Sequence, residues 1–362
     1  MSGRWTLPPL TTGELVPEFK AASRTNPNYH FSTVAGRYVL LAFMPREAAR
    51  RDAALAAFAS VRPLFDDRFL TAFFVASHPD GPEIPADQTP GQRWLFDPEG
   101  AVARQLQLGQ DEAVWLLLDP ALRLLDRAPI DRPEALLARI AAGLPPLDAY
   151  PGMVLVAPVL IVPRVFEPEF CRRLIDIYEA RGGLRSGVMR DIDGRTVGVL
   201  DGMKSRRDVN LENDQALRAE IKERIARTVL PMIGRAYQFR PTRIERYLVS
   251  CYDATEGGFF RPHRDNEALA TAHRRFACSI NLNSEEFDGG DLRFPEFGPR
   301  TYRPPTGGAV VFACNLLHEA TPVTRGRRYA FLPFFYDEEG QRIRDRNIGF
   351  LDSAPARAAG DR

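Results

Sequence analysis

The sequence predicts two domains of different class, an α/β layer domain followed by an α+β domain rich in strands. The chain has 362 residues, a length that two domains usually share. Residues 6–145 alternate continuous apolar runs with segments of helical spacing, which is typical of helices over a mixed sheet. From Arg243 onward, strand-like runs are separated by Gly, Pro and Asp at roughly the 8–12-residue spacing of a sandwich or barrel. The proline-rich segment 144–152 is the expected linker between domains at 1–147 and 152–350.

Each element of the first domain follows from a local pattern. Buried strands are expected where apolar residues run without a break, and helices where Ala, Arg and apolar residues recur at helical spacing. Asp119-Pro120 predicts a turn between two strands, and Asp131 is the expected N-cap of the last helix. In order, the expected elements are a strand in 38–45, a helix in 46–65, a strand in 69–81, a strand, turn and short helix in 93–109, two strands in 113–130 and a helix in 131–144.

The second domain is expected to open with a strand and an amphipathic helix in 160–183, which ends at Gly182-Gly183. A second long helix is expected in 213–236. Between them, 189–213 is polar and rich in glycine without a strong period, which predicts a loop. Residues 353–362 have the composition of a disordered tail.

The composition argues against several classes of protein. With 48 basic and 47 acidic residues the net charge is +1, so neither nucleic acid nor an anionic membrane is expected as a partner. The longest apolar runs, such as 153–163, are too short to span a bilayer. None of the four cysteines lies in a CxxC pair, which argues against a disulfide scaffold or a zinc ribbon. The N-terminus lacks the pattern of a secretory signal, so a cytoplasmic protein is expected.

The hexapeptide RPHRDN (261–266) is the first candidate for a functional site. His263 and Asp265 are two positions apart, so a strand would direct an imidazole and a carboxylate to one face. Alone, such a pair is also compatible with an ordinary surface strand. His318 follows the apolar segment GGAVVFACNLL and supplies a third ligand if the two strands are antiparallel. Two histidines and one carboxylate on one face are the ligand set of non-haem Fe(II) oxygenases, which leaves coordination positions open.

Arg328 lies ten positions after His318, in an apolar strand. A buried guanidinium needs a partner and is suited to bidentate binding of a carboxylate. A keto acid that chelates iron with one end could place its far carboxylate there. The alternative is a salt bridge to an acidic side chain of the protein. Arg325 and Arg327 are expected to face solvent.

These segments together resemble the 2-oxoglutarate/Fe(II) dioxygenase superfamily, and within it the prolyl-hydroxylase-like branch, over residues 154–345. The HxD pair, the distal histidine and the later arginine occur in the family's order, and DGGDLRF and GGAVVF match the turn and the strand around them. The resemblance implies a double-stranded β-helix, or jelly-roll, fold. It also implies that His263, Asp265 and His318 bind Fe(II) and that Arg328 binds the distal carboxylate of 2-oxoglutarate.

Further residues enter through the same resemblance. Tyr252 matches a tyrosine that lines the co-substrate pocket, with a half-buried barrel aromatic as the alternative. Asn281 stands where many members have a tyrosine or threonine, and its amide could bind a carboxylate. O2 is the implied second co-substrate, and ascorbate is a candidate additional cofactor. Segment 189–213 is a candidate lid over the substrate.

The implied activity is hydroxylation of a C–H bond in a peptide side chain or a small molecule, with release of succinate and CO2. The substrate itself cannot be read from the sequence. The alternative function is a non-catalytic protein that senses iron or 2-oxoglutarate and docks a partner. The complete ligand set argues against this alternative, because a protein that has lost catalysis is expected to lose a ligand.

The first domain resembles the thioredoxin fold, and within it the peroxiredoxins, over residues 6–145. LTTGELVPEF and VLLAFMPREA are similar to that family's opening segment and to the strand that leads to its reactive site. A peroxiredoxin needs a thiolate at the start of the next helix, but residues 44–51 read MPREAARR and the first cysteine of the chain is Cys171. A degenerate scaffold for recognition or dimerisation is therefore expected, and a thiol-dependent redox enzyme is not.

Several other polar or sulfur-bearing residues receive a structural interpretation. Residues 266–267 and 273–275 are interpreted as a solvated loop, with the entrance of the site as the alternative. His30 and His78 are interpreted as structural. Cys251, Cys278 and Cys314 are interpreted as small core residues in strands.

Overall fold

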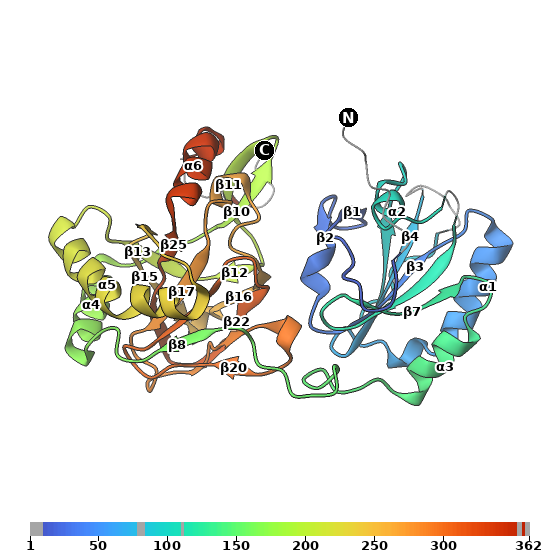
Figure 1. The fold of residues 1–362 in the computed structure, drawn as a ribbon, viewed down its shortest axis with the longest axis horizontal. Coiled ribbons are helices and arrows are strands. Elements are labelled where there is room, and N and C mark those ends of the chain that lie inside the picture. The colour runs from blue at the N-terminus through green and yellow to red at the C-terminus, as the bar shows by residue number, and fades with distance from the viewer. Residues whose placement is uncertain (1–9, 78–83, 110–111, 353–356, 359–362) are drawn as a thin grey trace. The chain divides into compact units, whose positions relative to one another are not determined.

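The computed structural model describes residues 10–77, 84–109, 112–352 and 357–358, which divide into two compact units (Figure 1). The first unit contains the chain up to Val156 together with Pro295–Pro299, and the second contains Ala157–Phe294 and the chain from Arg300 onward. No helix within the described ranges has the length and the apolar character that crossing a membrane requires.

The first unit is built on a seven-stranded mixed sheet of order β2-β1-β5-β4-β3-β6-β7. The three central strands β5, β4 and β3 are parallel to one another, and the remaining pairs are antiparallel. All residues of β3 and β4 are buried, which explains why their sequences are apolar without alternation. The strands are β1 (Lys20–Ser23), β2 (Tyr29–His30), β3 (Tyr38–Phe43), β4 (Leu70–Ala76), β5 (Gln92–Phe96), β6 (Val114–Leu118) and β7 (Leu124–Pro129).

The helices α1 (Ala48–Ala59) and α3 (Glu134–Ala142) lie on the same side of this sheet, and α2 (Ala101–Gln105) follows β5 (Figure 1). Phe58 of α1 and Leu136 of α3 belong to one core cluster with side chains from the sheet. The predicted α/β layering of this part is confirmed. The predicted N-cap is wrong: α3 is preceded by Pro133, and the Asp131 carboxylate instead accepts a hydrogen bond of 3.1 Å from Nε of Arg50.

The second unit contains two large antiparallel sheets, as the prediction of a β-rich sandwich requires, and two smaller ones. The larger has the strand order β14-β25-β17-β24-β15-β13-β9, with β21 paired to β17 and β8 paired to β21, and the smaller has the order β12-β16-β22-β19-β20. The larger sheet consists of β14 (Arg243–Glu245), β25 (Phe334–Tyr336), β17 (Phe276–Asn281), β24 (Arg327–Phe331), β15 (Leu248–Asp253), β13 (Arg207–Asn210), β9 (Leu184–Arg185), β21 (Ala309–Ala313) and β8 (Leu160–Val162). The smaller consists of β12 (Lys204–Ser205), β16 (Phe259–His263), β22 (His318–Ala320), β19 (Leu292–Arg293) and β20 (Thr301–Tyr302).

Helices α4 (Pro168–Arg181) and α5 (Gln215–Tyr237) lie side by side over the outer face of the larger sheet (Figure 1). Their apolar side chains form one core with alternate residues of the strands, such as Cys251 and Tyr329. Because successive side chains of a strand point to opposite faces, the neighbours Tyr252 and Arg328 point away from these helices. The inner face of the larger sheet therefore carries polar residues although the strands are buried.

The segment predicted to be a loop contains a hairpin, so that prediction is wrong. Strands β10 (Val188–Ile192) and β11 (Arg195–Leu200) pair antiparallel through a two-residue turn at Asp193 and Gly194, both with positive φ. Asp-Gly is the dipeptide that such a turn favours, and it was the signal in the sequence. Most of the tail at 353–362 lies outside the described residues, but Arg357–Ala358 form β26, which pairs parallel with β11.

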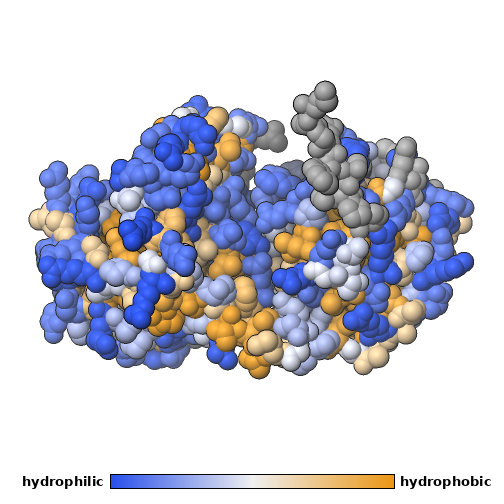
Figure 2. Space-filling model, viewed as in Figure 1, coloured by the Kyte–Doolittle hydropathy of each residue, from blue (hydrophilic) through white to orange (hydrophobic). Residues whose placement is uncertain are grey.

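The remaining elements lie at the edges of the second unit. Strands β18 (Asp288–Gly289) and β23 (Val323–Arg325) form a small antiparallel pair. The last helix, α6 (Glu338–Asn347), carries a charged side chain at most of its positions, and its surface is hydrophilic in Figure 2.

Candidate metal centre and its pocket

Three side chains from two strands of the smaller sheet meet at one point. His263 is the last residue of β16 and His318 the first of β22, and the antiparallel register pairs them directly. Their ring centroids are 4.3 Å apart. Asp265 lies just beyond the end of β16, where its backbone N–H donates to the carbonyl of Cys314 at 2.9 Å. This bond turns the chain so that the carboxylate reaches both imidazoles.

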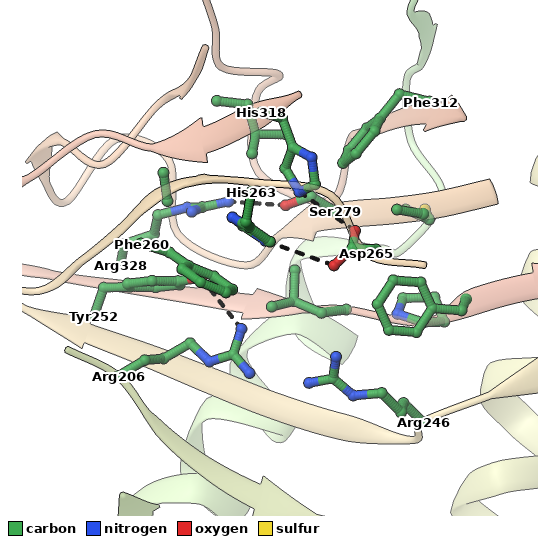
Figure 3. A pocket seen from close by; sticks show the side chains of 17 residues that line it. Arg206, Arg246, Tyr252, Phe260, His263, Asp265, Ser279, Phe312, His318 and Arg328 are labelled. Atoms are coloured by element: carbon green, nitrogen blue, oxygen red, sulfur yellow. Dashed lines mark hydrogen bonds and ion pairs between the residues drawn. The ribbon is translucent and has the colours of Figure 1, made fainter. Parts of the chain in front are cut away.

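The donor atoms are oriented toward one another (Figure 3). One ligand atom from each of the three residues lies within 4.8 Å of the other two. Asp265 Oδ1 is 3.6 Å from His263 Nε2, and Asp265 Oδ2 is 3.3 Å from His318 Nε2. The Nδ1 of His263 lies 2.8 Å from the carbonyl of Arg261, and that of His318 lies 3.0 Å from the carbonyl of Leu316. A carbonyl only accepts, so each Nδ1 carries the proton and each Nε2 presents a lone pair to the centre.

The pKa shifts in the site favour the unprotonated forms of its ligand atoms. Burial, with help from the neighbouring His263, lowers the pKa of His318 to about 4. Burial raises the pKa of Asp265, but the charged surroundings of its carboxylate, Arg274 among them, hold this pKa well below its usual value. A neutral imidazole and an ionised carboxylate are the forms that bind a divalent metal. The residues present therefore fit a two-histidine, one-carboxylate centre with open positions, as non-haem Fe(II) uses.

The centre opens into a pocket between the two sheets. Phe260 stacks on the ring of His263 with centroids 3.4 Å apart, and Phe312 lies 4.5 Å from the ring of His318. These aromatic rings exclude water from two sides of the donor atoms. The polar wall of the pocket is formed by Arg206, Arg246, Tyr252, Ser279 and Arg328 (Figure 3).

Arg328 is buried in this wall with only neutral partners. Its Nη2 donates to Ser279 Oγ at 2.8 Å and to Asn281 Oδ1 at 3.2 Å, and its guanidinium lies 5.1 Å from the ring centroid of Tyr252. Among the described residues it forms no ion pair, so the alternative of an internal salt bridge is wrong. Burial lowers the pKa of Arg328, although an arginine remains charged at neutral pH. Arg325 and Arg327 are exposed, as predicted.

The other two residues predicted to bind the co-substrate occupy different places. Tyr252 lines the pocket, and its hydroxyl accepts a hydrogen bond of 3.3 Å from Arg206. Asn281 is outside the pocket lining, where its side chain accepts from Arg328 and its amide donates to the carbonyl of Pro304 at 3.3 Å. Asn281 therefore orients the arginine and does not itself face the cavity.

Sequence reasoning missed two pocket residues, Arg206 and Arg246. Arg206 follows β12 in a segment where Lys204 and Arg206 alternate with residues facing outward, a period-two pattern that could have indicated a buried cationic face. Arg246 lies in the turn between β14 and β15 and has no such signal.

Residues 273–275 were interpreted as a solvated loop, with the site entrance as the alternative, and His273 fits neither. Its side chain is buried, and Nε2 contacts the carboxylate of Glu245. Arg274 donates to the same carboxylate, through Nε at 3.1 Å. His78 lies outside the described residues, whereas the four cysteines are buried and free, as small core residues are.

Parts of the chain are similar to known proteins. Residues 247–336 match the family model of the 2OG-Fe(II) oxygenase superfamily. A PKHD-type hydroxylase of Synechococcus sp. (strain JA-2-3B'a(2-13)) is 33% identical over 97 residues, which are 25% of this chain and 42% of that protein. The PKHD-type hydroxylase PiuC of Pseudomonas aeruginosa is 28% identical over 190 residues, 50% of this chain and 78% of that protein. Among solved structures, a Trichoplax adhaerens prolyl hydroxylase in complex with a peptide is 17% identical with a TM-score of 0.41, over 51% of this chain and 86% of that one.

Proposed function

Residues 247–336 belong to the 2OG-Fe(II) oxygenase superfamily, and from this premise we propose that the protein is an Fe(II)- and 2-oxoglutarate-dependent hydroxylase. In this proposal His263, Asp265 and His318 hold the iron. Arg328 binds the distal carboxylate of 2-oxoglutarate, with Tyr252 beside it. The observation that carries the proposal is the convergence of two Nε2 atoms and one carboxylate within 4.8 Å in a buried pocket.

The residues of the pocket have distinct tasks. Iron held by these three residues would supply the chemistry by which one oxygen atom of O2 enters succinate, as 2-oxoglutarate loses CO2, and the other enters a C–H bond of the substrate. The protein holds both Nδ1 protons on backbone carbonyls, which fixes the orientation of the imidazoles. Phe260 and Phe312 keep bulk water away from the reacting groups.

Arg328 is suited to its role because its charge lacks an acidic partner among the described residues. Its hydrogen bonds to Ser279 and Asn281 fix the plane of the guanidinium and leave its charge uncompensated. A carboxylate that enters the pocket would supply the missing negative charge and could bind the guanidinium in a planar, bidentate arrangement.

The substrate is proposed to be a small molecule or a peptide side chain. The first test is turnover of 2-oxoglutarate by the purified protein with Fe(II), O2 and ascorbate, followed as succinate release without added substrate and then with metabolite and peptide mixtures. Succinate release that substrate stimulates is the expected result. Fe(II) binding without any succinate release would instead favour the sensing function.

We further propose that the first unit is a thioredoxin-like scaffold without catalysis of its own. The mixed sheet with α1 and α3 on one face supports the scaffold, and the absence of cysteine before Cys171 supports the lack of thiol chemistry. The test is an assay of peroxide reduction with a thiol donor. The full chain is expected to show no such activity.

A further inference from the structure

The pocket carries more positive charge than the proposed iron centre and 2-oxoglutarate require. Besides Arg328, its wall contains the guanidinium groups of Arg206 and Arg246, which point into it from the side opposite His318 in Figure 3. Lys204, half-buried nearby, lies with Nζ 5.0 Å from the ring centroid of Phe260. Cations are seldom buried together unless an anion accompanies them.

The acidic groups near these cations are already engaged. Asp208 accepts from Arg206 Nη2 at 2.7 Å and from Ser250 Oγ at 2.7 Å. Glu245 is held by His273 and Arg274. One internal carboxylate, that of Asp208, thus serves Arg206, and it lies 3.9 Å from Arg246, at the limit of an ion pair.

Arg246 is the cation with the least compensation. Within the described part of the chain it makes no hydrogen bond, and its other contact is the ring of Phe334, at 5.1 Å. Its backbone has φ 67°, a left-handed conformation that costs energy for a residue other than glycine. Burial and the nearby charge of Arg206 lower the pKa of Arg246 to about 10, so the group stays charged at neutral pH. Strained backbone residues cluster at ligand sites, and here the strain accompanies a guanidinium that makes one long ion pair.

We propose that Arg246, assisted by Arg206, binds a carboxylate of the substrate. This inference rests on the proposed hydroxylase function and names its substrate class, a small molecule or chain terminus with a free carboxylate. Arg206 also has a buried Nε without a partner in the described residues, which adds a donor for the same anion. Arg328 on β24 remains the proposed partner of 2-oxoglutarate. Its orientation is fixed by hydrogen bonds to Ser279 and Asn281 on the neighbouring strand β17.

The assignment follows from the geometry of the guanidinium group. A guanidinium donates two parallel N–H groups to a carboxylate, which matches its planar shape. Binding of the carboxylate to Arg246 would fix the position of the substrate, so that the C–H bond to be hydroxylated points toward His263, Asp265 and His318.

The test compares free carboxylates with their amides. The full chain, loaded with Fe(II) and 2-oxoglutarate without O2, is titrated calorimetrically with the proteinogenic L-amino acids and with their carboxamides. A second arm uses tripeptides with free and amidated C-termini, which separates a free amino acid from a peptide terminus. At least one acid is expected to bind about tenfold or more tightly than its amide. If no acid in either arm binds better than its amide, the inference is wrong.

Variants link the effect to the residue. Arg246→Gln is expected to weaken the preferred acid by about tenfold or more and to leave the affinity for 2-oxoglutarate unchanged. Arg246→Lys keeps the charge and should restore part of the preference, which a general folding defect would not allow. Arg325→Gln, a change at an exposed arginine, is the matched control. Equal preference for acids in the wild type and Arg246→Gln would overturn the assignment. Succinate release on the same samples tests the hydroxylase function separately, because the titration does not depend on turnover.

Discussion

His263 and His318 form a direct cross-strand pair between β16 and β22, with their ring centroids 4.3 Å apart. Residues directly opposite in an antiparallel pair lie on the same face of the sheet, so this register brings together two imidazoles that are 55 positions apart in sequence. A shift of one residue would turn one of them to the other face. The proposed metal centre therefore depends on strand register as much as on residue type.

His318→Ala is expected to abolish Fe(II) binding and 2-oxoglutarate turnover while the fold is retained. The change removes one of three ligands, and the two that remain cannot hold the metal in the same geometry. Binding is measured by calorimetry with Fe(II) under anaerobic conditions, and folding by circular dichroism. His30→Ala, in the first unit, is the control and should bind iron normally. Unchanged iron affinity in His318→Ala would remove this residue from the site.

Arg328→Ala is expected to raise the 2-oxoglutarate requirement steeply. Loss of the charged partner of a buried carboxylate costs about 2–5 kcal/mol, which corresponds to roughly thirtyfold or more in the concentration needed. The measurement is the 2-oxoglutarate dependence of succinate release. Arg327→Ala, a change at the exposed neighbour that pairs with Asp253, should leave this dependence unchanged. The opposite pattern would assign the co-substrate to Arg327.

The cluster of His263, Asp265 and His318 could be predicted from sequence because few residue types bind a metal and because the HxD pair and the later histidine follow a specific order along the chain. Arg206 and Arg246 could not, since their role depends on where β12 and the turn after β14 cross the pocket. His273 was misread because its partner, Glu245, lies 28 positions earlier on another strand. The hairpin at 188–200 was missed because polar residues on both of its faces hide the alternation of a strand.

Glu245→Gln is expected to destabilise the second unit by about 3 kcal/mol, because it leaves the buried Arg274 without its counter-charge. The Glu245 carboxylate is largely buried, with 17% of the side chain exposed, so solvent screens the pair little. Urea unfolding measures the change. Glu338→Gln, at a 57% exposed residue that pairs with Arg243, is the control and should change stability by less than about 1 kcal/mol. Equal losses of unfolding free energy in the two variants would show that the buried Glu245–Arg274 pair contributes no more to stability than an exposed pair.

Asp67 provides a pH-dependent contribution to the stability of the first unit. Burial raises the pKa of its carboxyl, but hydrogen bonds from Arg93, at 2.7 and 2.6 Å, and from Thr71, at 2.8 Å, outweigh burial and lower the pKa to about 2. Since the pKa in the folded state is below the ordinary value of 3.8, this stabilisation is present above about pH 4. It is lost as the pH falls toward 2.

Asp67→Asn tests this contribution at an unchanged backbone, because asparagine adopts the left-handed conformation of residue 67 (φ 65°) as readily as aspartate. The variant is expected to be less stable than the wild type at pH 7, and the difference should shrink between about pH 4 and 2, since the wild type loses the ionised carboxylate there. Thermal unfolding at a series of pH values measures it. Asp52→Asn, at an exposed residue of α1, is the control. A difference that stays constant down to pH 2 would show that the ionised form of Asp67 is not what stabilises the fold.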